Sequence, residues 1–173
     1  FAVVLTLVDD VFGGARPSLD VWEVMPGVWL AFEVEPLGML YALVASCLWI
    51  PTSMYAIGYM RGHNEDNQTR FFTCFALAIF AALGIAFSKN LFTLFLFYEL
   101  LTFSTYPLVT HYNNAEARKA GRIYMGILVG TSVAFLLLAV VLTQHYAGTL
   151  DFKVGGILNG KVSGWETPVL LAL

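Results

Sequence analysis

Long stretches without a charged side chain constrain this sequence more than any other feature. Four of them follow one another along the chain: residues 36–60, residues 71–88, residues 90–115, which contain only Glu99, and residues 123–150. Lipid offers no partner to backbone N–H and C=O groups, so a segment that crosses a bilayer needs about 20 apolar residues in a helix. The pattern therefore predicts a membrane protein that crosses the bilayer several times.

We predict an all-α fold, a polytopic bundle with about four complete transmembrane helices. Their expected ranges are residues 36–60, 71–88, 91–111 and 122–146. Ser88, Lys89 and Asn90 separate the second range from the third, which indicates a tight antiparallel turn at the bilayer surface. Residues 1–173 are expected to form part of a single transmembrane domain.

Both ends of the sequence indicate partial helices. Residues 1–8 are apolar and stop at two aspartates, and no basic region precedes them as in a signal peptide. Thr167 and Pro168 suit the N-cap and first position of a new helix over residues 168–173. We therefore expect the chain to be an internal piece of a longer membrane protein.

Composition excludes several other classes of protein. Charged residues make up 12% of the chain and hydrophobic residues 58%, whereas soluble domains carry about 25% charged residues. The net charge of −3 gives no reason to expect nucleic acid as a partner. Cys47 and Cys74 both lie in apolar runs, which favours neither a disulfide framework nor a metal site.

The distribution of Lys and Arg predicts the orientation in the membrane. Arg61 and Arg70 flank the loop after the first predicted helix, and Arg118, Lys119 and Arg122 follow the third. The opposite side holds Lys89 in a short turn and its other basic residues in longer segments. The 61–70 and 112–122 loops are therefore expected to face the cytoplasm.

Glu99 is the one charged residue inside a predicted span. It lies eight residues after Leu91, or about 12 Å along a helix, which is near the bilayer midplane. Carboxylates at that depth are costly and usually mark an ion or proton pathway. The alternative is a structural role, with a protonated Glu99 hydrogen-bonded to another helix, and we favour the functional interpretation.

Three further residues are candidates for the same pathway. Thr102 and Tyr106 share a helix face with Glu99 and bring hydroxyl groups, next to a predicted kink at Pro107. For Thr102, Tyr106 and Pro107, ordinary helix packing is the slightly favoured explanation. His111 lies at the predicted cytoplasmic end of this helix and could relay protons, although solvation is the more common role for an interfacial histidine.

No phosphate-binding loop, zinc motif or nucleophile elbow is present in the sequence. We accordingly predict no catalytic residue, cofactor or metal ligand. A transporter component is expected, and not an enzyme by itself.

Four segments resemble one protein family. They are residues 35–41 (EPLGMLY), residues 54–60 (MYAIGYM), residues 70–72 (RFF) and residues 88–109 (SKNLFTLFLFYELLTFSTYPLV). Together they are similar to the D-type subunit of Mrp-type multisubunit cation/proton antiporters. They resemble, more distantly, the antiporter-like subunits of complex I and membrane-bound hydrogenases. The resemblance covers about residues 28–146.

The resemblance implies an inverted-repeat fold of fourteen helices, of which this chain would hold the third to the sixth. Glu99 would match a glutamate that pairs with a lysine on a later helix and tunes its proton affinity. That lysine would lie outside this chain. The implied setting is a multi-pass protein of a bacterial plasma membrane, with other membrane subunits, protons, monovalent cations and the lipid bilayer as partners.

Three functions follow as hypotheses. In the first, a subunit of a cation/proton antiporter couples inward proton movement to the export of Na⁺ (or of K⁺ or Li⁺). In the second, a proton-pumping subunit belongs to complex I or a membrane-bound hydrogenase and is driven by redox chemistry in its partners. In the third, the chain has only a structural role in a membrane complex, and Glu99 is incidental.

Overall fold

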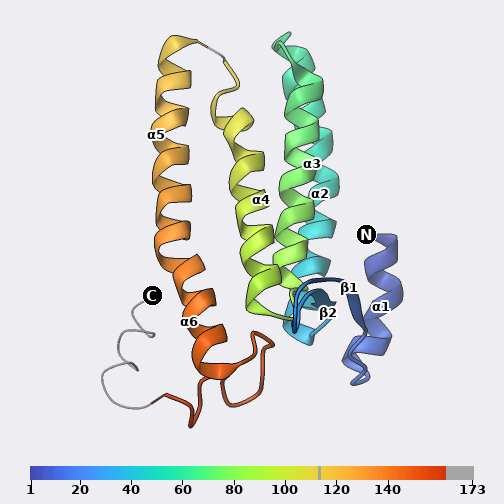
Figure 1. Ribbon diagram of the computed structural model, residues 1–173. Coiled ribbons are helices and arrows are strands. Elements are labelled where there is room, and N and C mark those ends of the chain that lie inside the picture. Colours follow the sequence, from blue (N-terminus) through green and yellow to red (C-terminus); the bar gives the residue numbers. More distant parts are fainter. Residues whose placement is uncertain (113, 163–173) are drawn as a thin grey trace.

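The computed structural model describes residues 1–112 and 114–162 and is mostly helical (Figure 1). Helix α1 (Ala2–Phe12) is followed by a hairpin of strands β1 (Ser18–Met25) and β2 (Val28–Glu33). Helices α2 (Pro36–Gly62), α3 (Gln68–Ala86) and α4 (Leu91–Val109) come next. The last element is a continuous helical rod that consists of α5 (Ala115–Thr131), a π-helical turn η1 (Ser132–Leu137) and α6 (Leu138–Ala147). The partial helix predicted at residues 168–173 lies outside the described residues.

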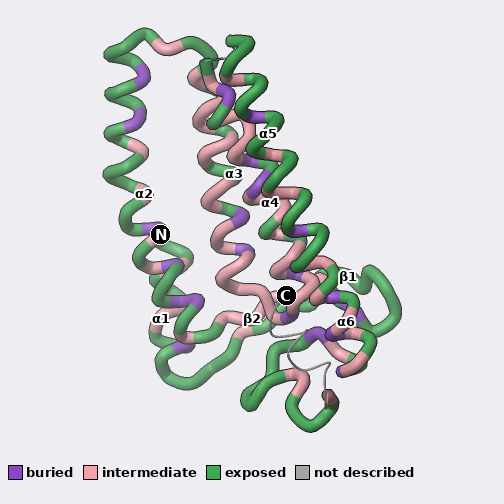
Figure 2. The backbone as a smooth tube through the Cα atoms, turned by 90° about the vertical axis from the view of Figure 1, so that its left-hand side faces the viewer, coloured by how far each residue is buried: buried purple, intermediate pink, exposed green. Residues whose placement is uncertain are grey.

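Four helical segments are long and apolar enough to cross a membrane, as the predicted fold class requires. They are Pro36–Gly62, Gln68–Ala86, Leu91–Val109 and Ala115–Ala147, the last one continuous through the π-helical turn. At most 22% of the most apolar part of each is buried inside the structure. Figure 2 shows how much of the bundle surface is exposed, and in a membrane this apolar surface contacts lipid or further helices.

The last span begins earlier than predicted, at Ala115 and not at residue 122. The Asn114 side chain caps this helix by accepting a hydrogen bond from the Ala117 N–H at 2.6 Å, and Glu116 lies in the first turn. Both features stabilise a helix N-terminus. The helix therefore extends beyond the predicted span, because absence of charge delimits the membrane-embedded part of a helix and not the helix itself.

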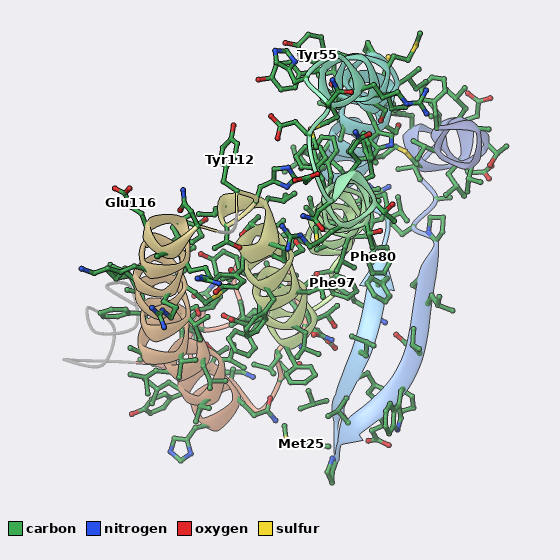
Figure 3. All side chains as sticks on the ribbon, turned by 90° about the horizontal axis from the view of Figure 1, so that it is seen from above. Met25, Tyr55, Phe80, Phe97, Tyr112 and Glu116 are labelled. Atoms are coloured by element: carbon green, nitrogen blue, oxygen red, sulfur yellow. The ribbon has the colours of Figure 1, made fainter. Side chains whose placement is uncertain are left out.

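Helices α3 and α4 form the most closely packed pair. Gly84 makes this possible, because a Cβ atom at this position would collide with the ring of Phe97. Phe80 and Phe97 meet edge to face, with ring centroids 5.6 Å apart (Figure 3). The short turn predicted at Ser88, Lys89 and Asn90 joins these two helices.

The β-hairpin was not predicted. Its strands pair antiparallel, with Ser18 opposite Glu33 and Met25 opposite Val28. Gly27 forms the turn with a φ of +78°, a conformation that glycine adopts without strain. Every residue of β1 is exposed, whereas Val28 and Ala31 of β2 are buried. Strand β2 is therefore the one that joins the hairpin to the bundle.

Strand β2 docks on the start of α4 through buried polar groups. The Asn90 side chain donates to the Trp29 carbonyl at 2.8 Å and accepts from the Thr93 N–H at 2.8 Å. The Thr93 hydroxyl accepts from the Ala31 N–H at 3.1 Å. Asn90 is 2% exposed and Thr93 is 0% exposed, so these bonds are shielded from water.

The turn between α3 and α4 lies between two other segments. On one side, the Lys89 N–H donates to the Ala31 carbonyl at 3.1 Å and the Glu33 N–H donates to the Phe87 carbonyl at 2.8 Å. On the other side, the Leu91 N–H donates to the Leu150 carbonyl at 3.0 Å. We call the hairpin, this turn and residues 148–152 the hairpin end of the molecule. Residues 63–67 and 110–112 form the opposite end, which we call the loop end.

Candidate functional site

Glu99 lies in the middle of α4, within the bundle. Its Oε1 atom is buried and has no hydrogen-bond partner among the described residues. Burying a carboxyl oxygen without a partner is costly, so this atom needs a partner in the working protein.

Contacts on either side of Glu99 indicate which way it faces. Phe95, one turn before it, packs against the buried cluster that contains Val140 of α6. Tyr106, two turns after it, lies against Gly121 of α5. Because residues at these spacings share one face of a helix, Glu99 belongs to the face of α4 directed toward the rod α5–η1–α6.

Thr102 and Tyr106 lie on this same face. Thr102 is 6% exposed, and its hydroxyl donates to the Tyr98 carbonyl of its own helix at 3.1 Å. The ring of Tyr106 covers Gly121, where a side chain would also collide with Thr110. Pro107 lies in the last turn of α4, which ends at Val109. The structure thus aligns these candidates with Glu99 but joins none of them to it by a hydrogen bond among the described residues.

His111 follows the end of α4 and is largely enclosed, with 13% of its side chain exposed. Its Nε2 atom lies 3.9 Å from Oε2 of Glu65, in the loop between α2 and α3. The Arg70 guanidinium of α3 donates to the His111 carbonyl at 3.0 Å. Phe71 packs edge to face on the imidazole, with ring centroids 5.6 Å apart. His111 is therefore packed against α3 and its preceding loop.

A polar cavity of about 370 Å³ opens beside His111. It is lined by His63, Asn64, Glu65, Asp66, Asn67, His111 and Tyr112. The Arg70 Nε and His111 Nδ1 atoms next to it are buried and have no partner among the described residues. Such a cavity can hold water and could admit protons or hydrated cations.

Sequence reasoning used Arg70 for topology and, with residues 71 and 72, for the family resemblance, and it gave Glu65 no role. Only the packing of α4 against the preceding loop shows that both residues meet His111. By sequence spacing, His111 lies about 18 Å from Glu99 along the helix. The described residues therefore contain two separate polar sites, one at mid-helix and one at the loop end.

At the hairpin end, Lys89 pairs with Asp20 of β1, with Nζ and Oδ1 3.0 Å apart. The hydrogen bond from Lys89 to Asp20 raises the pKa of Lys89 from its usual 10.5, aided by the charges of Asp20, Asp151 and Glu33 and opposed by burial. This lysine holds the hairpin to the bundle. Among the described residues, no group of three or more His, Cys, Asp or Glu side chains could hold a metal ion.

Comparisons with known proteins also indicate a helical membrane protein. Residues 88–171 match the model of a family described as NADH:quinone oxidoreductase/Mrp antiporter, transmembrane. This part of the chain is therefore similar to antiporter-like membrane proteins. The match begins at the turn before α4 and includes every residue of the mid-helix site.

Two curated relatives are antiporter subunits of staphylococci. The chain is 31% identical over 129 residues to the antiporter subunit mnhA2 of Staphylococcus haemolyticus, an alignment that covers 74% of this chain and 16% of the relative. It is 30% identical over 120 residues to the A1 subunit of the Na(+)/H(+) antiporter of Staphylococcus aureus, covering 68% of this chain and 14% of the relative. The chain thus spans less than a fifth of these antiporter relatives.

A solved structure shares the fold. The chain aligns with part of the membrane-bound sulfane sulfur reductase, an archaeal respiratory membrane complex, with a TM-score of 0.67 and 22% identity. The alignment covers 87% of this chain and 30% of that one. The comparisons support an antiporter-like membrane protein whose relatives are subunits of larger assemblies, but the curated relatives carry names of the A type and not of the D type.

Proposed function

We propose that this chain is part of an antiporter-like protein in a multisubunit cation/proton antiporter. Inward proton movement drives the export of Na⁺ (or of K⁺ or Li⁺), and Glu99 tunes a proton-carrying lysine outside residues 1–173. The observation that carries the proposal is the buried, unpartnered Oε1 of Glu99 in a membrane-spanning helix, among the residues that the structure describes. A lysine ammonium group from a later helix would give this oxygen a partner of opposite charge.

The other candidates have supporting roles in this proposal. Tyr106 and Thr102 extend the face of Glu99 toward the loop end, and Tyr106 supplies a hydroxyl group there. His111 and its cavity form the cytoplasmic mouth, where the imidazole lies 3.9 Å from the Glu65 carboxylate beside a cavity that can hold water. Water must complete the path, because about 18 Å of helix separates the mouth from Glu99.

Subunit type is part of the proposal. The residues 88–109 resemble the D type, whereas the relatives from staphylococci are of the A type. We propose the D type on the strength of that segment. The complete coding sequence tests this, because a chain as long as the A-type relatives, of which this one covers 16%, would favour the A type.

A second function is favoured by the family description, which includes NADH:quinone oxidoreductase. In that case the same helices pump protons while redox chemistry proceeds in partner subunits. Membrane vesicles distinguish the two functions. A cation gradient alone moves protons through an antiporter, whereas a redox-driven pump needs an electron donor and acceptor.

Glu99→Gln in the full-length protein tests the role of Glu99. It removes the charge and keeps the shape, so antiport in everted vesicles should fall at least tenfold while assembly stays normal. Glu116→Gln is the matched control, because Glu116 is exposed in the first turn of α5 and its loss should leave antiport unchanged. Normal antiport by the Glu99→Gln protein at normal expression would refute the proposal and favour a structural role.

A further inference from the structure

A groove between α4 and α5 opens on the outside of the described bundle. It has a volume of about 540 Å³. Its lining residues are Phe103 and Tyr106 of α4 and Arg122, Met125, Gly126, Val129 and Gly130 of α5. Most of this lining is apolar, and Arg122 is the one charged residue among the described residues that form it.

The groove exists because α4 and α5 touch at one level and separate at the next. At Gly121 a side chain would collide with Thr110 and Tyr106, so the end of α4 contacts α5 there. At Gly126 and Gly130 a Cβ atom would lie within 4 Å of no described group outside its own stretch of helix. Both of these glycines are exposed. Space is therefore left along this face of α5, farther into the span.

Arg122 lies at the depth where the lipid head groups meet the hydrocarbon. The rod Ala115–Ala147 has 33 residues and is thus about 50 Å long, which exceeds the thickness of about 40–45 Å of a whole bilayer. Its charged first turns therefore lie among the head groups. Residues 123–150 carry no charge, so the hydrocarbon begins just after Arg122. From there the groove runs to Gly130, or about 12 Å into the hydrocarbon.

Two further basic residues continue the line of Arg122 toward the loop end. Arg118 and Lys119 lie four and three residues before it, which puts them on the same helix face. All three side chains are exposed, and none of them forms an ion pair with a described residue. Glu116 lies six residues before Arg122 and is therefore about 120° around the helix from it. The head-group end of the groove is thus positively charged.

An occupant of this groove needs an apolar body and an anionic head. A phospholipid has both, because its acyl chain can lie along the glycine face while its phosphate stays at the level of Arg122. Arginine binds phosphate through two N–H donors, and basic pockets between transmembrane helices bind anionic head groups. Small residues four apart also let a second helix pack closely. Such a helix would continue past Arg122 and meet three positive charges, so charge complementarity favours the lipid.

We propose that the α4–α5 groove binds an anionic phospholipid of the surrounding bilayer. One acyl chain lies along Gly126 and Gly130, and the Arg122 guanidinium binds the phosphate. Arg118 and Lys119 add to the attraction of the head group. A long basic side chain keeps its methylene groups on apolar surface while its charge reaches the head groups. This site goes beyond the proposed function and requires neither antiport nor redox-driven pumping.

Photo-crosslinking with labelled lipids tests the proposal on the intact complex. The complex is reconstituted in phosphatidylcholine bilayers with a small fraction of phosphatidylglycerol that carries a photoreactive group on its acyl chain. After irradiation, mass spectrometry of peptides measures how much lipid is attached to residues 123–130. We expect the anionic probe to label this segment at least fivefold more than phosphatidylcholine that carries the same photoreactive chain.

Two variants remove the two parts of the site. Arg122→Gln removes the charge that binds the phosphate, and Gly126→Leu fills the groove. Each should lower labelling of this segment by the anionic lipid at least fivefold, whereas Arg122→Lys should retain most of it. Arg61→Gln and Gly58→Leu are the matched controls, because both residues are exposed on α2 and neither lines the groove. Labelling should stay unchanged in both controls.

Equal labelling by the two lipids, or by the unaltered protein and Arg122→Gln, would show that this segment only faces bulk lipid and would overturn the proposal. Absence of labelling would show that another helix covers the groove, with the same consequence. If Gly126→Leu does not assemble, the comparison of the two lipids on the unaltered complex still decides. Antiport is not measured in this test, so the proposed function stands or falls separately.

Discussion

The two ends of the bundle are built differently. At the hairpin end, main-chain hydrogen bonds join strand β2, the turn at Ser88–Asn90 and residues 150–152, and Asn90 and Thr93 are buried among them. At the loop end, contacts between distant elements run through side chains around a polar cavity: the Arg70 bond to the His111 carbonyl and the long Glu65–His111 pair. Figure 1 shows the compact hairpin end and the separate helix tips opposite.

This difference indicates where the bundle can move. Buried main-chain hydrogen bonds are lost only at high cost, whereas a long side-chain pair such as Glu65–His111, at 3.9 Å, adds little. The loop end should therefore open more easily than the hairpin end. In a transporter, such asymmetry would let one mouth rearrange while the other stays fixed.

The largest expected effect is at the hairpin end. Asn90→Ala removes the buried cap of α4 and leaves the Trp29 carbonyl without its 2.8 Å donor, so the free energy of unfolding should fall by about 2–3 kcal/mol. Thermal unfolding in detergent measures this. Asn114→Ala removes an exposed cap of α5 and should cost about 0.5–1 kcal/mol. Equal losses of unfolding free energy in the two variants would contradict the proposed difference between the two ends of the bundle.

An intermediate effect is expected at the loop end. Glu65→Gln removes the charge 3.9 Å from His111, and the free energy of unfolding should change by less than about 1 kcal/mol because the pair is partly exposed. Local opening should respond more, with faster hydrogen exchange over residues 63–67. Asp66→Asn, in the same cavity, is the control. Unchanged exchange in Glu65→Gln would show that the pair does not hold the loop.

The smallest effect concerns the Lys89–Asp20 pair. Folding raises the pKa of Lys89 above 10.5, so the pair stabilises the fold fully below that value and loses its contribution as the pH rises through the higher folded pKa. The contribution should be below about 1 kcal/mol, because both side chains are partly exposed. Asp20→Asn should lower the thermal midpoint slightly at about pH 8, below the usual pKa of lysine, and not at about pH 12, above it. A loss of equal size at both values would rule out the charge pair as its cause.

Much of the architecture was predictable because membrane insertion leaves a strong pattern in a sequence. Charge-free runs located the four spans, and the short turn at Ser88–Asn90 was visible between two of them. Glu99 stood out because any carboxylate at that depth needs a partner. The helix of the last predicted span begins earlier than the span itself, since residues 115–121 carry charges and are helical nonetheless.

Other features had no signal in the sequence. The hairpin has a turn glycine that the sequence shows. Which of its strands is buried depends on the hydrogen bonds of β2 to Asn90 and Thr93, which lie about 60 residues later. Glu65 and Arg70 resemble any charged loop residues until α4 brings His111 to them. The π-helical turn at Ser132–Leu137 has an ordinary apolar sequence.

The sequence by itself determined the class of protein, the spans and the one charged residue within them, because the cost of exposing charge or backbone to lipid acts on each segment separately. Only the tertiary structure decided which polar groups meet at the two ends of the bundle. Those outcomes depend on contacts between residues far apart in the chain, and local hydrophobicity carries no information about them.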